Sequence, residues 1–453
     1  MKILLANEGC IMGGVETWMV SLSSMLRARG HDCELFFFNH GPMEQNLPAD
    51  MTAHFGDLAD LLKLASSKGF DLIHANSTDW HTGIAAVRSL GVKLVLTSHG
   101  RNVPTWNPLN SDALVSCSRW EAEEQQAQTG VPVQTVLNGI DTERFKPAEV
   151  AETKGPPIVA WIGRGINVEQ KRIDKLAAIA PLLHEAGLRL HLVEPYGPDE
   201  VSKVAPEAVS ALLPVADFWG AVPVEKMAGF YLEVAASGGC VLSTSSFEGL
   251  PLTLLEAQAA GCPAIGPDVR GVNECISPEH GGILYPFEME AKELAALIIK
   301  TLGDADEMRW RRSACEKFAC EEFSLERMTR DYLKVYEKAM QTAPLKSFST
   351  ERSLFGVWPK LGWKGYLEHC WSGGHCQYLA SRKLAAEGEW RLAEIAARSA
   401  LSTCPTLFTR PQRALHLLKT ELRSKFSSRP APERETGGQS GITPPVEAER
   451  HEP

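Results

Sequence analysis

The chain alternates short, continuously apolar runs with longer amphipathic segments. The apolar runs of the first part are KILLAN, CELFFFN, LIHAN, KLVLTSH and ALVSCS, and a second series follows residue 150: PIVAWIGR, LRLHLVEP, DFWG, GCVLSTS, CPAIGP and GILYP. Continuous apolar strands that alternate with helices are typical of parallel sheets covered on both faces. The pattern therefore predicts two doubly wound α/β domains, residues 1–150 and 151–342, which meet at the linker-like stretch PAEVAETKGPP.

The remainder of the chain is expected to be helical and then disordered. FSLERMTRDYLKVYEKAM begins with a capping signature at Ser324, so we expect a long helix that closes the second domain and ends at Pro344. Within residues 346–425, GEWRLAEIAARSALSTCP has small residues at spacings that resemble the second half of a tetratricopeptide repeat. A single repeat favours a helical hairpin packed on the protein over a full array. Residues 427–453 contain Pro, Gly, Ser and charged residues and are expected to be disordered.

Composition narrows the class of protein. The 453 residues carry a formal net charge of −10, which argues against a general nucleic-acid partner. The eleven cysteines are scattered, and most lie in apolar runs, as expected for reduced thiols in a cytoplasmic protein. The first residues resemble a strand more than a signal peptide. No run of about 18 uncharged apolar residues is present, so we expect no transmembrane helix.

The first domain offers two weak candidate sites at strand ends, where open α/β sheets bind their ligands. Gly13 and Gly14 precede a helix, so main-chain N–H groups there could approach a phosphate. His99 follows the fourth strand. A Gly-Gly turn is more often simply a turn, and a histidine at a strand end is more often structural than catalytic.

The second domain is richer in candidate chemistry. Arg164 ends its first strand, and Lys171 and Arg172 follow in the next loop. Cations just beyond a strand end can neutralise a diphosphate, although a solvated charged loop would give the same pattern.

Two carboxylates stand in SSFEGLPLTLLEAQAAGCP. Glu248 lies in the loop before a helix that starts near Pro251, and Glu256 lies inside the apolar part of that helix. A buried carboxylate requires a protein partner, a bound ligand or a proton. An ionised carboxylate only accepts hydrogen bonds, which suits ribose hydroxyls.

These residues resemble the family-4 retaining glycosyltransferases, which have the GT-B fold of two facing Rossmann-like domains. The specific element is Glu248, seven residues, then Glu256, within S-x-x-E-G-x-P-L-x-x-L-E-A-x-A-x-G-x-P. GGVE, SHG, VLNGIDTERFKP, IGR…K and GGILYP support it, in the order of the family. The resemblance covers the chain from its first residue to about residue 340. It implies an α/β GT-B fold with the helical region as a C-terminal extension.

The resemblance also implies roles for the second domain. Arg164 and Lys171 would hold the diphosphate of a nucleotide-sugar donor, and Glu256 would bind its ribose. Glu248 would contact hydroxyls of the transferred sugar, near the main-chain N–H groups of Gly249 and Leu250. The family transfers sugars with retention, the usual proposal being a same-face attack helped by the leaving diphosphate. No protein nucleophile, metal ion or cofactor is then expected, and the carboxylates are not a glycosidase acid–base pair.

In the first domain, the resemblance implies that Gly13 and Gly14 close over the phosphate and that His99 faces the sugar. Three departures from the family pattern stand out. Arg164 and Lys171 are seven residues apart instead of about five, so Arg172 is an alternative ligand. VEPYGPD replaces a glycine-rich turn, which leaves the donor base open. HAN at residues 74–76 replaces a more usual pair of histidines.

The appended segment is basic, with 13 Lys or Arg against 6 Asp or Glu in residues 346–425. It could dock on a membrane surface or an acidic partner, or it could simply place its four tryptophans (358, 363, 371 and 390) in a core with solvated cations outside. HCWSGGHC does not have a standard zinc-ligand spacing, and we expect no metal there.

Three functions remain open. The first is transfer of a sugar from a nucleotide-diphosphate sugar to a glycan, lipid-linked or other acceptor in surface polysaccharide or glycoconjugate synthesis, by a cytoplasmic protein or one peripheral to the inner face of the membrane. The second is nucleotide-sugar epimerisation on the same fold. The third is a catalytically silent scaffold that binds a partner through the extension. The intact set of Arg164, Glu248 and Glu256 argues against the scaffold.

Overall fold

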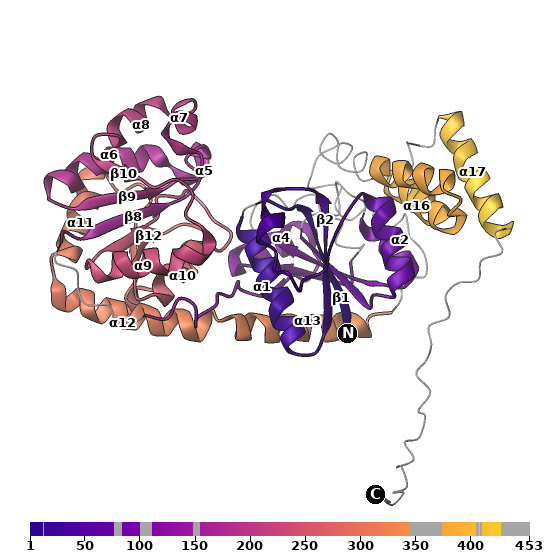
Figure 1. Cartoon of the computed structure of the whole chain (residues 1–453), viewed down its shortest axis with the longest axis horizontal. Coiled ribbons are helices and arrows are strands. Elements are labelled where there is room, and N and C mark those ends of the chain that lie inside the picture. Colours follow the sequence, from indigo (N-terminus) through magenta and orange to yellow (C-terminus); the bar gives the residue numbers. More distant parts are fainter. Residues whose placement is uncertain are drawn as a thin grey trace, which may run out of the picture.

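The computed structural model contains two α/β domains and a helical extension arranged in a row (Figure 1). It describes residues 1–11, 13–76, 84–99, 111–147, 155–343, 374–404, 407 and 410–426. No helix among these residues is long and apolar enough to cross a membrane.

The first domain is built on a seven-stranded sheet of order β3-β2-β1-β4-β5-β6-β7, in which every pair is parallel. Its strands are β1 (Lys2–Gly9), β2 (Asp32–Asn39), β3 (Ala53–Phe55), β4 (Leu72–Asn76), β5 (Lys93–Ser98), β6 (Ala113–Ser116) and β7 (Gln134–Thr135). Its helices are α1 (Gly14–Ala28), η1 (Pro42–Asn46), α2 (Leu58–Lys68), η2 (Ile84–Leu90) and α4 (Arg119–Thr129). Consecutive residues Ile3–Ala6 of β1 are all fully buried, because helices cover both faces of the sheet.

The second domain has a six-stranded parallel sheet of order β10-β9-β8-β11-β12-β13. Its strands are β8 (Ile158–Ile162), β9 (Arg189–Val193), β10 (Ala216–Phe218), β11 (Cys240–Leu242), β12 (Ala264–Pro267) and β13 (Ile283–Tyr285). Its helices are α5 (Val168–Lys171), α6 (Ile173–Glu185), α7 (Gly197–Ser202), α8 (Pro206–Leu212), η4 (Val224–Lys226), α9 (Met227–Ala236), α10 (Leu252–Ala259), η5 (Pro278–His280) and α11 (Ala291–Leu302). The two predicted doubly wound sheets are confirmed.

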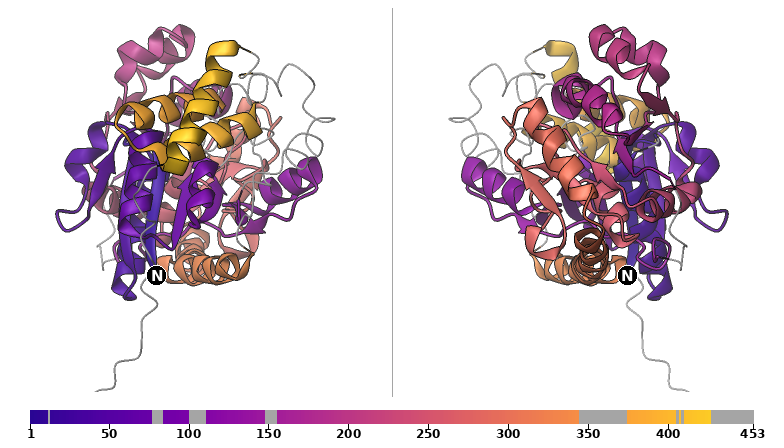
Figure 2. Two further views of the ribbon diagram at one scale, coloured as in Figure 1. Left: turned by 90° about the vertical axis from the view of Figure 1, so that its right-hand side faces the viewer. Right: turned by 90° about the vertical axis from the view of Figure 1, so that its left-hand side faces the viewer.

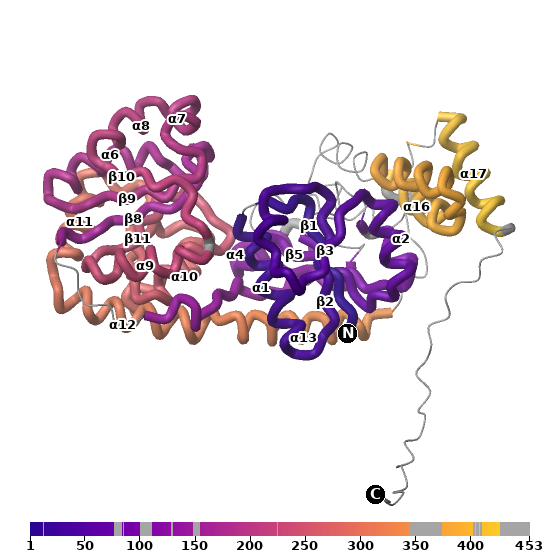
Figure 3. Tube along the Cα trace, in the orientation of Figure 1, coloured from indigo at the N-terminus to yellow at the C-terminus, as the bar shows by residue number. Residues whose placement is uncertain are grey.

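Two long helices run beneath both domains, α12 (Ala305–Glu322) and α13 (Leu325–Gln341) (Figure 3). Ser324 caps α13 by accepting a hydrogen bond from the N–H of Arg327 at 3.3 Å, as its sequence signature predicts. The helix packs against the first sheet, since Tyr336 OH lies 2.7 Å from Nδ1 of His74 in β4. The helix expected to close the second domain thus crosses to the first.

The extension is helical as predicted and packs on the first domain (Figure 2). It contains a helix over residues 374–386, then α16 (Trp390–Thr403) and α17 (Pro411–Phe426). Leu384 is fully buried in the same core as Leu61 and Leu62 of α2. The tail at 427–453, Trp358, Trp363, Trp371 and most of HCWSGGHC lie outside the described residues. Among the residues described, no cluster of three or more His, Cys, Asp or Glu could hold a metal ion.

Candidate functional site

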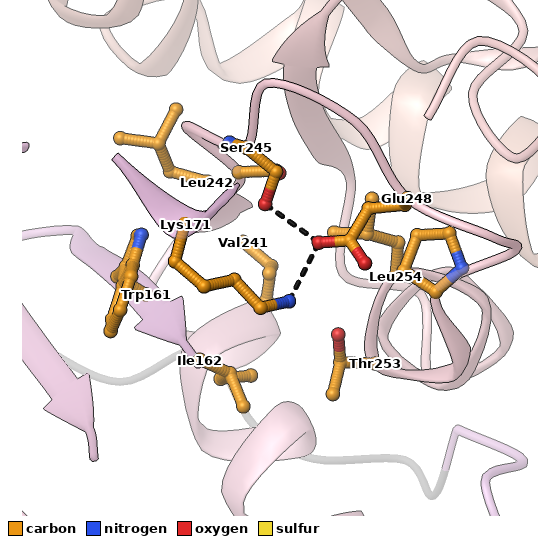
Figure 4. Close-up of a pocket in the computed structure, with 11 residues that line it drawn as sticks. Trp161, Ile162, Lys171, Val241, Leu242, Ser245, Glu248, Thr253 and Leu254 are labelled. Atoms are coloured by element: carbon orange, nitrogen blue, oxygen red, sulfur yellow. Dashed lines mark hydrogen bonds and ion pairs between the residues drawn. The ribbon is translucent and has the colours of Figure 1, made fainter. Parts of the chain in front are cut away.

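A pocket opens where the loops after β8 and β11 meet at the carboxyl ends of these strands (Figure 4). Its lining includes Trp161, Lys171, Ser245, Glu248 and Thr253. The sequence places Lys171 and Glu248 77 positions apart, and the fold brings them together because β8 and β11 are neighbours in the sheet.

Glu248 is the centre of the pocket. Its Oε1 lies 2.6 Å from Nζ of Lys171 and accepts a hydrogen bond from Ser245 Oγ at 2.7 Å, while Oε2 accepts one from Gln170 Nε2 at 3.3 Å. The side chain is 10% exposed. Three donors from Lys171, Ser245 and Gln170 therefore hold this carboxylate in one position.

Main-chain geometry fixes the Glu248 loop from behind. The N–H of Glu248 donates to the carbonyl of Arg270 at 3.0 Å. Gly271 has φ of +80°, and a Cβ there would lie 2.1 Å from the carbonyl oxygen of Glu248. Only glycine allows this approach of the two loops.

The longer spacing between Arg164 and Lys171 is accommodated by α5, which is bound to the β11 loop. Ser246 N–H donates to the carbonyl of Gln170 at 2.8 Å, and Thr244 Oγ1 donates to the carbonyl of Lys171 at 2.7 Å. Lys171 consequently reaches Glu248. Arg172 is turned elsewhere: its guanidinium pairs with Asp174 at 2.7 Å.

Glu256 projects from α10 towards Tyr231 of α9, whose hydroxyl donates to Oε2 at 3.0 Å. Burial raises the pKa of Glu256 to about 7, although the Tyr231 hydrogen bond and the charge of Arg144 favour the ionised form. The Glu256 carboxylate is thus hydrogen-bonded by a tyrosine, and with this pKa it is protonated in a fraction of molecules near neutral pH.

Arg164 is exposed and lies just beyond the end of β8. Burial raises the pKa of Glu16 of α1, and the hydrogen bond from Asn7 (2.8 Å) and the charge of Arg164 only partly oppose this rise. A Cβ on Gly14 would lie 3.7 Å from Cδ1 of Leu252, so the starts of α1 and α10 approach each other. Gly13 is the N-cap residue of α1.

His99 lies at the end of β5, inside the first domain. Its Nε2 is 3.1 Å from Oδ1 of Asn76, and its ring meets Trp18 edge-on with centroids 4.5 Å apart. Burial lowers the pKa of His99 to about 3, so the ring is neutral. His74, the departure in HAN, bonds Tyr336 and Thr97 and belongs to the core.

Glu194 was not foreseen from the sequence. It stands in VEPYGPD, is fully buried, and accepts hydrogen bonds from the N–H groups of Gly165 (3.1 Å) and Tyr196 (2.9 Å). Its carboxylate joins the loop after β9 to the loop after β8. Burial raises the pKa of Glu194. The unusual VEP in place of glycines was the signal that marked this position.

Family comparisons agree with this architecture. Residues 12–144 match the family described as Glycosyltransferase Family 4, and residues 156–304 match Glycosyl transferases group 1. The chain belongs to the family-4 glycosyltransferases of GT-B fold.

Among solved structures, Anabaena Alr3699/HepE in complex with UDP and glucose aligns with a TM-score of 0.63 and 17% identity, over 74% of this chain and 99% of that one. The lipopolysaccharide core biosynthesis mannosyltransferase LpsB of Rhizobium meliloti is 24% identical over 75% of this chain and 98% of its own. The GDP-mannose-dependent alpha-mannosyltransferase of Mycobacterium tuberculosis is 29% identical over 38% of this chain. That match spans 44% of the relative's own length, and a D-inositol 3-phosphate glycosyltransferase of Nocardia farcinica is matched over 41% of its length.

The residues in and around the pocket of this glycosyltransferase indicate which ligand groups it can bind. Arg164, Lys171 and the N-terminus of α10 favour an anion. Glu248 presents carboxylate oxygens that accept hydrogen bonds from hydroxyl groups, whereas Arg164 and Glu256 lie outside the pocket lining. An anionic group next to several hydroxyls is the ligand chemistry that fits this edge.

Proposed function

We propose that this glycosyltransferase moves a sugar from a nucleotide-diphosphate sugar to a hydroxyl group of a glycan or lipid-linked acceptor. The observation that carries the proposal is the Lys171–Glu248 pair in a pocket at the carboxyl ends of β8 and β11. This pair supports the proposal because a cation suits a diphosphate and the neighbouring carboxylate suits sugar hydroxyls. The solved relative bound to UDP and glucose supports the same ligand class.

The cations and the helix start hold the donor in this proposal. Arg164 and Lys171 neutralise the diphosphate, and the main-chain N–H groups of Gly249 and Leu250 lie in the loop that leads into α10. Glu256 accepts hydrogen bonds from the ribose hydroxyls. The ribose hydroxyls would add donors to this half-buried carboxylate beside the hydroxyl of Tyr231.

Transfer occurs with retention of configuration. The acceptor oxygen forms its bond to the anomeric carbon on the face from which the diphosphate leaves, and a diphosphate oxygen takes the acceptor proton. Charge builds up on the leaving diphosphate, so Arg164 and Lys171 stabilise the transition state. Glu248 is held by Lys171, Ser245 and Gln170, and it orients the sugar instead of attacking it.

The first domain completes the site. Gly13 and Gly14 bring α1 close to the start of α10, where they cover the phosphates. His99 is neutral and offers a ring nitrogen to a sugar hydroxyl. The names of LpsB and HepE's complex point to hexose transfer, and surface glycan synthesis at the inner face of a membrane fits a lipid-linked acceptor.

The first test is thermal stability with UDP-glucose, GDP-mannose and ADP-glucose, in wild type and in Glu256→Gln. A donor at 100-fold excess over its Kd should add about 2.7 kcal/mol to the free energy of unfolding. We expect one donor to stabilise wild type and to lose most of that effect in Glu256→Gln.

Glu233→Gln is the matched control, because Glu233 is an exposed glutamate of the neighbouring helix α9. It should keep the full donor shift. If every donor leaves wild type unshifted, or if both variants behave alike, the donor assignment fails.

A further inference from the structure

Helix α17 presents a leucine face to solvent. Leu415, Leu418 and Leu422 are 52%, 56% and 57% exposed. Their spacing of three and four residues puts them on one side of the helix. On the other side Thr420 is buried, so α17 already has an inward face against the extension. The leucine face is a second apolar surface on the same helix.

Cations flank this face. Helical geometry places Lys419 and Arg423 on one side of the leucines and Lys425 on the other, and all three are exposed. The guanidinium of Arg423 lies 4.5 Å from the centre of the Trp390 ring. Glu421 is the one acid within α17, and it pairs with Arg398 of α16 at 3.1 Å.

The extension carries this face at one end of the molecule. Figures 1 and 2 show α17 on the outside of the extension, at the opposite end from the second domain. The extension is tied to α2 by Lys383, which bonds Asp57 (2.9 Å) and Asp60 (2.8 Å), and by Lys63 with Glu387 (2.9 Å). The extension, with the cationic and apolar face of α17, is therefore fixed to the first domain. The whole chain has a net charge of −10, so this basic end differs in charge from the chain as a whole.

We propose that the α17 face, defined by Leu415, Leu418, Leu422, Lys419, Arg423 and Lys425, docks on an anionic membrane surface. The leucines enter the boundary between headgroups and acyl chains, while the cations lie at the lipid phosphates. Pairing with a second copy would bring two sets of the same three cations together, which is unfavourable. This inference rests on the proposed function, because a lipid-linked acceptor lies at a membrane. Binding of the α17 face to the membrane requires neither a bound donor nor turnover.

The test is co-flotation of the full chain with vesicles of phosphatidylglycerol and phosphatidylcholine, and with vesicles of phosphatidylcholine alone. We expect binding to the anionic vesicles, and loss of it at high ionic strength. Lys419→Glu/Arg423→Glu/Lys425→Glu should weaken that binding at least about tenfold. Leu415→Ser/Leu418→Ser/Leu422→Ser should also weaken it, although it leaves the net charge unchanged.

The matched control is Lys300→Glu/Lys317→Glu/Lys338→Glu, which changes the net charge equally at exposed sites of α11, α12 and α13. It should float like wild type. All variants should retain the wild-type circular dichroism and the donor-induced thermal shift, so failure of docking is distinguishable from failure of the donor site. Absence of wild-type flotation, equal loss in the control, or leucine-dependent dimers in sedimentation would overturn the proposal.

Discussion

Nζ of Lys171 lies 2.6 Å from Oε1 of Glu248, so the residue proposed to bind the diphosphate is paired with the residue proposed to bind the sugar. A bound donor must share Lys171 with Glu248, and Ser245 and Gln170 remain to hold the carboxylate. Within the pocket, the ammonium of Lys171 thus balances the charge of the buried Glu248 carboxylate.

Lys171→Gln should lower kcat/KM for the donor by about 10²- to 10³-fold, the usual cost of losing one group that stabilises transition-state charge. Arg172→Gln is the control, because Arg172 bonds Asp174. It should change kcat/KM little. A loss confined to Arg172→Gln would make Arg172 the diphosphate-binding residue, and comparable losses in both variants would contradict the assignment to Lys171 alone. Initial rates at varied donor concentration decide between them.

The pH dependence should follow Glu256, whose pKa is raised by burial to about 7. Below its ordinary pKa near 4.5 the group is protonated whether the chain is folded or not. As the pH rises from there to about 7, the unfolded chain releases this proton first, so Glu256 lowers the free energy of unfolding. Glu256→Gln should flatten this part of the stability profile measured by chemical denaturation.

Donor binding should show the opposite trend with pH. If the ionised carboxylate accepts the ribose hydroxyls, the competent fraction rises about tenfold between pH 6 and pH 8, and the apparent Kd should fall by the same factor. Titration calorimetry at the two pH values measures this. An apparent Kd that is equal at both pH values would contradict the role of Glu256.

Much of the fold could be predicted from the sequence because buried parallel strands are continuous apolar runs. Strands β1, β4 and β8 were predicted within about a residue or two of their bounds. Glu248 and Glu256 stood out in the sequence because a charge in an apolar helix or at its entrance is costly. Glu194 and Gln170 were missed because their partners, the N–H of Gly165 and the carboxylate of Glu248, are set by strand order. The roles of all the site residues stay predictions: Gly13, Gly14, His99, Arg164, Lys171, Glu248, Gly249, Leu250 and Glu256.

The sequence analysis also missed a contact between the domains, because its partners are far apart in the sequence. Helix α4 of the first domain is capped by a residue of the second domain. Glu274 accepts hydrogen bonds from the N–H groups of Arg119 (2.7 Å) and Trp120 (3.0 Å), where the N-cap residue Ser118 makes no side-chain cap. Glu274→Ala should cost about 1 kcal/mol, as other lost caps do. It should also increase the radius of gyration measured by X-ray scattering, because the contact joins the two domains.

Glu279→Ala is the control for that contact, since Glu279 is an exposed residue of η5 in the same domain. It should leave both quantities unchanged. A Glu274→Ala protein with the wild-type radius and stability would mean that α4 does not depend on this carboxylate.

Gly271→Ala should disable the Glu248 loop. At φ of +80° an alanine is strained by about 1–2 kcal/mol, and its Cβ would in addition collide with the carbonyl of Glu248 at 2.1 Å. Gly187→Ala separates the two effects, because Gly187 has φ of +79° and nothing within 4 Å of the added Cβ. We expect Gly187→Ala to lower Tm slightly and keep turnover, and Gly271→Ala to lower both. Similar values for the two variants would show that the loop adapts.

The contact of the extension with α2 should be a measurable part of stability. Leu384 is fully buried in the core that contains Leu61 and Leu62, so Leu384→Ala should cost about 2–5 kcal/mol. Leu379, on the same helix, is 49% exposed, and Leu379→Ala should stay within about 0.5 kcal/mol of wild type. Chemical denaturation measures the free energy of unfolding of each variant. Hydrogen exchange of the α2 amides shows whether the lost stability is located in that helix. Faster exchange in α2 of Leu384→Ala is expected, because the extension covers that helix; unchanged exchange there would mean that α2 is stable without it.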